Sequence, residues 1–328
     1  MCIMKKLAAA GFFAGFLMMG SMAQATDLKF ATLAPQGTTM HKQLQQAADE
    51  IKAKTGGRVT MTIFAGGTAG DEKDFVRKMN FGELQGAALT GVGLGLINSE
   101  VRVLELPFLL KNTAMADKVY VAMRPYFEKA FNAKGFVLLG WAEVGFVNIF
   151  SNKAIKNKAD LQGTKMWMWA GDPLAESMYR ALGVTPVPLA LTDVLTSLQT
   201  GMIDGAYAPP LGAIAFQWHT KTKFVTDVNL VNATGALVVS KKEWAKISGA
   251  DQTMIKGILE AKAKSLVAQT RVENGQSKEA LKSAGLQVVT LDAAALGELE
   301  AAAQSVQKDL VGKLYPQALL DQVLSLAK

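Results

Sequence analysis

The chain has 328 residues, of which 50% are hydrophobic and 19% are charged, with 30 Gly, 9 Pro and a single Cys. This composition is typical of a globular chain with two domains, and it excludes a disordered chain, a collagen and a disulfide-stabilised scaffold. The 35 basic residues exceed the 28 acidic ones, but the two kinds are interleaved. Because no basic stripe with aromatic residues occurs, we expect no binding to nucleic acid.

The first 25 residues have the pattern of a secretory signal peptide. Two lysines precede an apolar run over residues 7–19, and an Ala-Gln-Ala site follows at 23–25. The run is shorter than the ~20 residues that cross a bilayer, so a membrane anchor is the weaker alternative. Cleavage after residue 25 would also remove Cys2, the only cysteine. We therefore expect a periplasmic protein without disulfides.

Strand and helix signals alternate along the rest of the chain, which predicts an α/β fold. Strands are predicted over 28–33, 59–63, 84–90, 136–141, 146–151, 165–169, 203–207 and 236–240. Helices are predicted over 40–54, from Asp71 onward, and over 113–133, 173–183, 192–200 and 251–284. A capping box at 240–243 predicts one more helix start.

The helix predicted over 251–284 would be unusually long. It contains no Pro and would extend ~50 Å at 1.5 Å per residue. A helix of that length can brace two domains. Two helices with a kink at Gly257 or Gly275 are the alternative.

No arrangement of residues demands catalysis. His41 and His219 are the only histidines, and they lie far apart in the sequence, so a zinc site is disfavoured. Neither a G-x-S-x-G elbow nor a phosphate-binding loop of the G-x-x-x-x-G-K-[ST] type is present. The glycine-rich run 91–95 has its third glycine one position early for a dinucleotide site, and we interpret it as a tight loop. We expect no enzyme, no cofactor and no metal, with a hydrolase on a two-lobed scaffold as the alternative.

Aromatic residues are more informative. Trp167 and Trp169 lie two apart on a predicted strand, so both side chains point to one face, either as a core pair or as the wall of a ligand site. Ligand sites of open α/β sheets form beyond the carboxyl ends of the strands. Further residues that fall at strand ends or in loops are Trp141, Glu143, Phe146, Tyr207 and Trp218.

Several short motifs resemble those of the DctP-type solute receptors of TRAP transporters. They are LKFAT at 28–32 with His41-Lys42, KTGGRV at 54–59, FAGG at 64–67, LELPFL at 104–109, GVTPVPL at 183–189, SLQTG at 197–201 and IDG at 203–205. Each motif is weak alone, but their order and spacing cover essentially all of the mature chain.

The resemblance implies a two-domain periplasmic-binding-protein fold, which is a type II-like clam-shell with hinge strands and a long bracing helix. It implies a first domain over 26–145 plus about 235–270, and a second over 146–234 plus about 271–328, with the ligand between them. It also implies that the receptor delivers a small-molecule ligand to the small and large membrane subunits of a TRAP permease. We expect a monomer, with a dimer left open. A sensor for a signalling partner is the alternative.

The sequence departs from the family where the family's organic acids are bound. Trp167 stands where the family usually has its carboxylate-binding arginine, and Val147 stands at a second frequent arginine. Ala208 replaces an asparagine that binds ligand. Because burying a carboxylate without a partner costs on the order of several kcal/mol of binding free energy, we expect a ligand with an aromatic or apolar body. A cationic amine near Glu143, or an anion at the helix start that Asp172 would cap, are alternatives.

The expected ligand-binding residues come from both domains. They are Gln36, Thr90, Gly91 and Val92 in the first domain, Glu143 and Phe146 near the hinge, and Trp167, Trp169, Tyr207 and Pro209 in the second.

Overall fold

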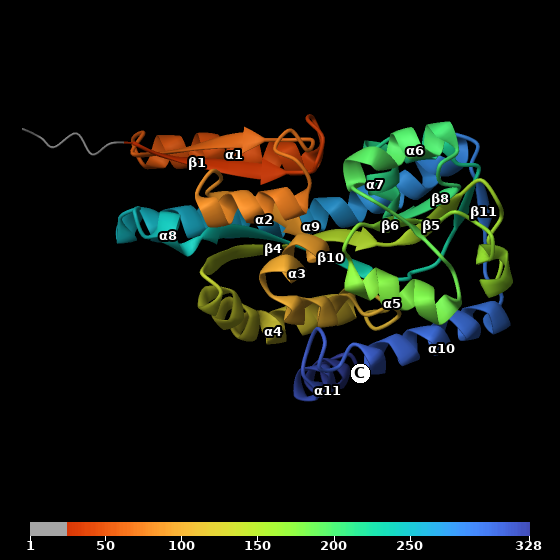
Figure 1. Cartoon of the computed structure of the whole chain (residues 1–328). Coiled ribbons are helices and arrows are strands. Elements are labelled where there is room, and N and C mark those ends of the chain that lie inside the picture. The colour runs from red at the N-terminus through yellow and green to blue at the C-terminus, as the bar shows by residue number, and fades with distance from the viewer. Residues whose placement is uncertain (1–24) are drawn as a thin grey trace, which may run out of the picture.

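The structure is a computed structural model that describes residues 25–328. Residues 1–24 of the predicted signal peptide lie outside the described residues. Two separate sheets form the centre of the molecule (Figure 1). We call the part around the larger sheet the first lobe and the part around the smaller sheet the second lobe.

The first lobe is built on a five-stranded sheet with the order β2-β1-β3-β10-β4. β1 pairs in parallel with β2 and β3, whereas β10 runs antiparallel between β3 and β4. The strands are β1 (Thr26–Thr32), β2 (Val59–Phe64), β3 (Gly86–Thr90), β4 (Phe136–Phe146) and β10 (Asn232–Ser240). The helices are α1 (Thr39–Lys54), α2 (Glu72–Phe81), α3 (Gly91–Ile97), η1 (Ser99–Glu105), α4 (Thr113–Ala133) and α8 (Lys241–Trp244).

The second lobe is built on a four-stranded sheet with the order β11-β9-β5-β8, beside a two-stranded parallel pair, β6 and β7. The strands are β5 (Asn148–Ser151), β6 (Trp167–Trp169), β7 (Val187–Leu189), β8 (Gly205–Ala208), β9 (Phe224–Thr226) and β11 (Gln287–Val289). The helices are η2 (Lys158–Leu161), α5 (Pro173–Leu182), η3 (Leu191–Asp193), α6 (Val194–Thr200), α7 (Pro210–Ala215), η4 (Trp218–Lys221) and α10 (Ala293–Asp309).

Two of the places where the chain crosses between the lobes are adjacent. β4 passes into β5 at Val147, and the segment around Val231 leads back into β10. Val147 N donates to Val231 O at 2.9 Å, and Leu230 N donates to Val147 O at 3.1 Å, so the crossings are paired with each other. The sequence predicted the first of these strands to end at residue 141, whereas pairing with β10 extends it to Phe146.

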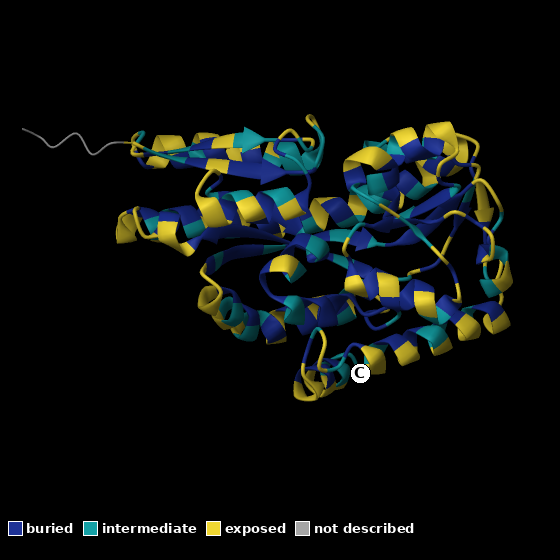
Figure 2. Cartoon of the chain, viewed as in Figure 1, coloured by how far each residue is buried: buried dark blue, intermediate teal, exposed yellow. Residues whose placement is uncertain are grey.

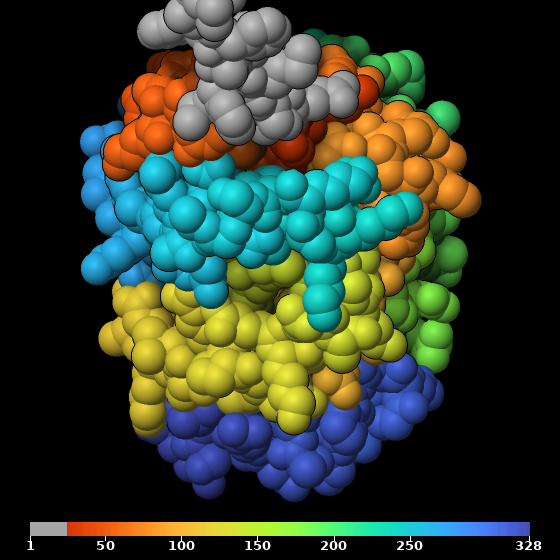
Figure 3. All heavy atoms as spheres, turned by 90° about the vertical axis from the view of Figure 1, so that its left-hand side faces the viewer, coloured from red at the N-terminus to blue at the C-terminus, as the bar shows by residue number. Residues whose placement is uncertain are grey.

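One continuous helix, α9 (Gly249–Ser283), contacts β4 and α1 of the first lobe and α7 of the second. The prediction of a single bracing helix is therefore confirmed, and the alternative of two helices is wrong. The last helix, α11 (Gln317–Leu326), packs against α4 and η1. Figure 3 shows these C-terminal residues, in blue, beneath the yellow residues of the first lobe. The domain boundaries stay a proposal, and this contact favours placing 317–326 with the first domain.

Local capping explains where α5 begins and ends. Asp172 caps its first turn, Pro173 occupies the first helical position, and Gly183 ends it in the left-handed conformation with φ 70°. The prediction for this helix is confirmed. Figure 2 shows how burial is distributed in the molecule, with the strands mostly buried and the outer faces of the helices exposed.

Two local predictions are wrong. The glycine-rich run begins the helix α3 and is not a tight loop. Its glycines still serve a close approach, because a Cβ at Gly91 would lie 2.0 Å from the Glu105 carboxylate. The capping box at Ser240 is absent, because Ser240 N donates to Gln85 O and no side chain caps α8, although this helix begins at Lys241 as predicted.

No helix within residues 25–328 combines the length and the apolar character needed to cross a membrane.

Candidate ligand-binding site

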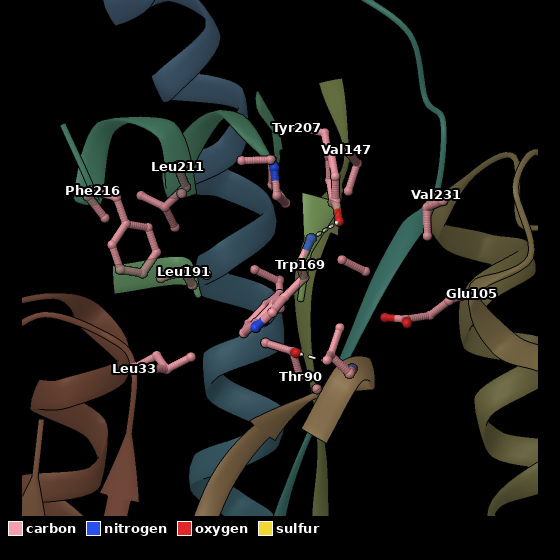
Figure 4. Close-up of a pocket in the computed structure, with 18 of the residues that line it drawn as sticks. Leu33, Thr90, Glu105, Val147, Trp169, Leu191, Tyr207, Leu211, Phe216 and Val231 are labelled. Carbon is pink, nitrogen blue, oxygen red and sulfur yellow. Dashed lines mark hydrogen bonds between the residues drawn. The ribbon is translucent and has the colours of Figure 1, made fainter. Parts of the chain in front are cut away.

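A cavity of about 510 Å³ lies between the two sheets and takes its lining from both lobes. That volume falls within the usual range for small-molecule sites, about 300–1,000 Å³. Figure 4 shows Trp169 projecting into it between Leu33, Thr90 and Leu191, with the Glu105 carboxylate facing it from the opposite side. The lining is mostly apolar, and the polar groups within it are few and buried.

Aromatic rings from the second lobe form one wall of the cavity. Trp167 stacks on Tyr207 with ring centroids 4.7 Å apart and an interplanar angle of 25°. Trp218 meets Trp167 edge-on at 5.3 Å, and Trp169 lies tilted at 5.9 Å. Trp167 is only 1% exposed and Trp169 is 7% exposed. Trp167 therefore forms the base of the wall, and Trp169 is the more exposed indole of the pair.

Hydrogen bonds within the protein hold the polar atoms of these rings. Trp167 Nε1 donates to Leu189 O at 3.1 Å, and the Tyr207 hydroxyl accepts from Trp169 N at 3.3 Å. Trp169 Nε1 donates to Asp71 Oδ2 at 3.0 Å, and this bond joins the second lobe to the start of α2 in the first. Because the ring N–H groups of Trp167 and Trp169 already have partners, these two indoles offer a ligand their ring faces.

Arg102, on η1, is the one basic side chain that lines the cavity within the described residues, and sequence reasoning missed it. It is 5% exposed and lies between two carboxylates: its Nη2 donates to Asp172 Oδ2 at 3.0 Å, and its Nε lies 3.1 Å from Glu105 Oε2. The second contact is an ion pair whose atoms are not aligned for a hydrogen bond. Burial alone would lower the pKa of Arg102, but the charges of Asp172 and Glu105 raise it. The arginine is thus engaged by the protein itself.

The two carboxylates around Arg102 have further backbone partners. Glu105 Oε1 accepts from Thr234 N at 2.7 Å, while burial raises the pKa of Glu105 against the opposing charge of Arg102. Asp172 Oδ1 accepts from Leu174 N at 3.0 Å, so Asp172 occupies the helix start as the sequence predicted. The only sequence signal for Arg102 was its spacing three residues before Glu105 in the LELPFL motif.

Glu143 is also taken by a protein partner. Arg271 on α9 donates to Glu143 Oε2 through Nε at 3.0 Å and through Nη2 at 2.6 Å. The same guanidinium donates to both carboxylate oxygens of Asp117, at 2.9 and 2.6 Å. These charges raise the pKa of Arg271. The alternative of a ligand cation beside Glu143 therefore meets a site already neutralised by an arginine.

The predicted ligand-binding residues divide into two sets. Those that line the cavity are Thr90, Val92, Glu143, Trp167, Trp169, Tyr207 and Pro209. Those outside its lining are Gln36, Gly91 and Phe146. Gln36 is exposed, Gly91 lies against the Glu105 carboxylate, and Phe146 neighbours the lining residue Val147 on an extended segment, where successive side chains point to opposite faces.

Glu72 is a buried carboxylate at the first-lobe side of the cavity. It is 1% exposed and accepts from Thr90 N at 2.7 Å, from Thr90 Oγ1 at 2.8 Å and from Gly93 N at 2.6 Å. Burial outweighs these bonds and raises the pKa of Glu72 from 4.5 to about 7.

We expect the stability of the protein to depend on the charge of Glu72. Because its folded-state pKa lies above the unfolded value, the folded state binds more protons between pH 4.5 and about 7. Its contribution is fully present below pH 4.5 and is lost as the pH rises through 7, by up to ~3 kcal/mol. Urea unfolding from pH 4.5 to 8 should show a smaller fall for Glu72→Gln than for the parent or for a variant of the exposed Glu83, Glu83→Gln. Equal slopes in all three would contradict this assignment.

Within residues 25–328, no three His, Cys, Asp or Glu side chains are placed to hold a metal ion.

The family model of the bacterial extracellular solute-binding proteins, family 7, matches residues 30–313. The chain therefore belongs to this family, the DctP family, whose members are solute-binding receptors and not enzymes. Receptors of TRAP transporters bind small molecules and work with TRAP membrane subunits.

Individual relatives agree with the family. A solute-binding protein of Verminephrobacter eiseniae is 26% identical over 272 residues, which are 81% of this chain and 80% of the relative. The crystal structure of a sugar acid binding protein from Advenella mimigardefordensis, in complex with galactonate, has a TM-score of 0.87 at 20% identity and covers 93% of this chain and 98% of its own. A TRAP periplasmic solute binding protein from Shewanella oneidensis with bound succinate also has a TM-score of 0.87, at 17% identity, and covers 93% of this chain and 100% of its own. These structures share the two-domain clam-shell fold.

Proposed function

We propose that this protein is a periplasmic receptor for a small organic solute with an aromatic or apolar body and no carboxylate, which it delivers to a TRAP permease. The signal-peptide pattern at 1–25 supports export to the periplasm. The proposal that the ligand lacks a carboxylate rests on the ion pairs of Arg102. This residue is the only basic group that lines the cavity in the described residues, and it is already paired with Glu105 and Asp172.

Electrostatics disfavours an anionic ligand here. A carboxylate entering the cavity would meet Arg102 beside two protein carboxylates, and the repulsion from these like charges is strong in a medium of low dielectric constant. The positions where the family's arginines are expected are occupied by Trp167 and Val147, which offer no donor for a carboxylate. An uncharged or cationic solute avoids this cost.

The wall of the cavity supports an aromatic or apolar body. Trp169 and Tyr207 present ring faces, and Leu33 and Leu191 add aliphatic surface. Offset stacking of a ring on an indole contributes about 0.5–1.5 kcal/mol beyond the area buried. A cation would gain a comparable amount over the same rings.

Two polar contacts connect the lobes across the cavity and support binding by closure. They are the hydrogen bond from Trp169 to Asp71 and the ion pair between Arg102 and Asp172. We propose that the lobes close over the solute about the paired crossings at Val147 and Val231.

Calorimetric titration with ligands matched in shape tests this function. The protein from residue 26 onward would be titrated with an alcohol, an amine and an acid that carry the same aromatic group. The first set is 2-phenylethanol, 2-phenylethylamine and phenylacetate, and the second is the corresponding set with an indole ring. We expect the alcohol or the amine to bind at least tenfold more tightly than the acid, because the cavity offers the carboxylate of the acid no unpaired positive charge. Succinate serves as the anionic control. Tightest binding by an acid, or by succinate, would instead support an organic-acid receptor with a rearranged anion site.

A further inference from the structure

We infer that Asp172 determines ligand specificity by acting as an internal carboxylate, which occupies Arg102 and thereby excludes carboxylate ligands. This inference rests on the proposed function, because it concerns the solute site of the same cavity. Asp172, Arg102 and Glu105 all line that cavity, and all three are nearly fully buried.

The position of Asp172 follows from its place in the chain. It comes three residues after Trp169, at the point where β6 has ended and α5 begins. One carboxylate oxygen, Oδ1, accepts from the backbone N–H groups of Leu174 and Ala175. This fixes the side chain in one orientation and leaves Oδ2 to accept from Arg102 Nη2 at 3.0 Å.

The ion pair between Arg102 and Asp172 affects which ligands can bind, because Arg102 lines the cavity. Arg102 comes from η1 of the first lobe, so the ion pair with Asp172 joins the two lobes within the cavity lining. An arginine facing a cavity is well suited to pair with a ligand carboxylate through two parallel hydrogen bonds. Here Nη2 is taken by Asp172, and Glu105 lies beside Nε. The three side chains together carry one negative charge in excess, which repels a further anion.

The substitution Asp172→Asn would separate the two roles of this side chain, which are to cap α5 and to pair with Arg102. The amide oxygen of asparagine can cap α5 as well as a carboxylate does, so the helix start should be kept. The charge that holds Arg102 would be lost, and one arginine would then face one carboxylate, Glu105. The guanidinium would be free to pair with an incoming carboxylate, as a charge-assisted hydrogen bond requires.

The test is a gain of function. We expect Asp172→Asn to bind phenylacetate at least tenfold more tightly than the parent does, so that the ratio of acid affinity to alcohol affinity rises by at least that factor. Adding Arg102→Met to the variant should abolish the gain. Glu176→Gln, on an exposed residue of the same helix, is the matched control and should leave both affinities unchanged.

The outcomes separate the two claims. If the parent itself prefers phenylacetate, the proposed function fails, and this inference fails with it. If the parent prefers the alcohol but neither Asp172→Asn nor Asp172→Ser gains acid binding while melting near the parent temperature, the inference alone is overturned. Serine also caps helices, so the second variant covers a failure of the first to fold.

Discussion

Replacing Trp169 with alanine should weaken binding of the tightest ligand of the matched series by about 30-fold to 1,000-fold. The indole projects into the cavity, and large buried aromatic anchors of this kind commonly contribute about 2–4 kcal/mol. The same change removes the hydrogen bond from Nε1 to Asp71, which joins the two lobes. Calorimetric titration measures the effect.

Two further variants separate the contributions to this effect. Trp169→Phe keeps an aromatic face but loses the N–H donor, so it should recover part of the affinity. Trp244→Ala removes an equally buried indole from α8, which is not part of the cavity lining, and should lower stability without changing affinity. An affinity unchanged in Trp169→Ala would show that this ring only fills space.

The second large effect concerns stability. Arg271→Met should lower the free energy of unfolding by about 3–5 kcal/mol, because it leaves the buried Glu143 carboxylate without its partner. Chemical denaturation monitored by circular dichroism would measure the loss. The effect should be large although Arg271 itself is only partly buried, since the cost arises from the desolvated Glu143.

Adding Glu143→Gln to Arg271→Met should recover a substantial part of this loss, because an uncharged amide is less costly to bury than a carboxylate. Arg180→Met breaks an exposed ion pair with Glu176 and should cost less than about 1 kcal/mol. A cost for Arg271→Met no larger than that for Arg180→Met would contradict the view that Arg271 stabilises the fold by neutralising the buried Glu143.

Much of the fold could be predicted because local chemistry and tertiary packing agree. Thr113–Ala133 and Pro173–Leu182 carry apolar periodicity and end one or two residues before a glycine, and both helices form where predicted. Predictions were wrong where a distant partner decided the outcome. β4 extends to Phe146 because β10 pairs with it, and α8 begins without its predicted capping box because Ser240 N donates to Gln85 O.

The candidate site was only partly predictable for the same reason. Strand alternation placed Trp167 and Trp169 on one face, and the structure brings Tyr207 beside them. Alternation could not show which indole would be nearly sealed in the aromatic cluster and which would enter the cavity. It also gave no sign of Arg102, whose partner Asp172 lies 70 residues away in the sequence. Nor could it show that Arg271, rather than a ligand, would pair with Glu143.

The most direct test of the account is a crystal structure of the protein with the tightest member of the matched series. We predict electron density for the solute between the two sheets, with its body in van der Waals contact with Trp169 and Arg102 still paired with Asp172. Density outside this cavity, or a ligand carboxylate seated on Arg102 in place of Asp172, would contradict it.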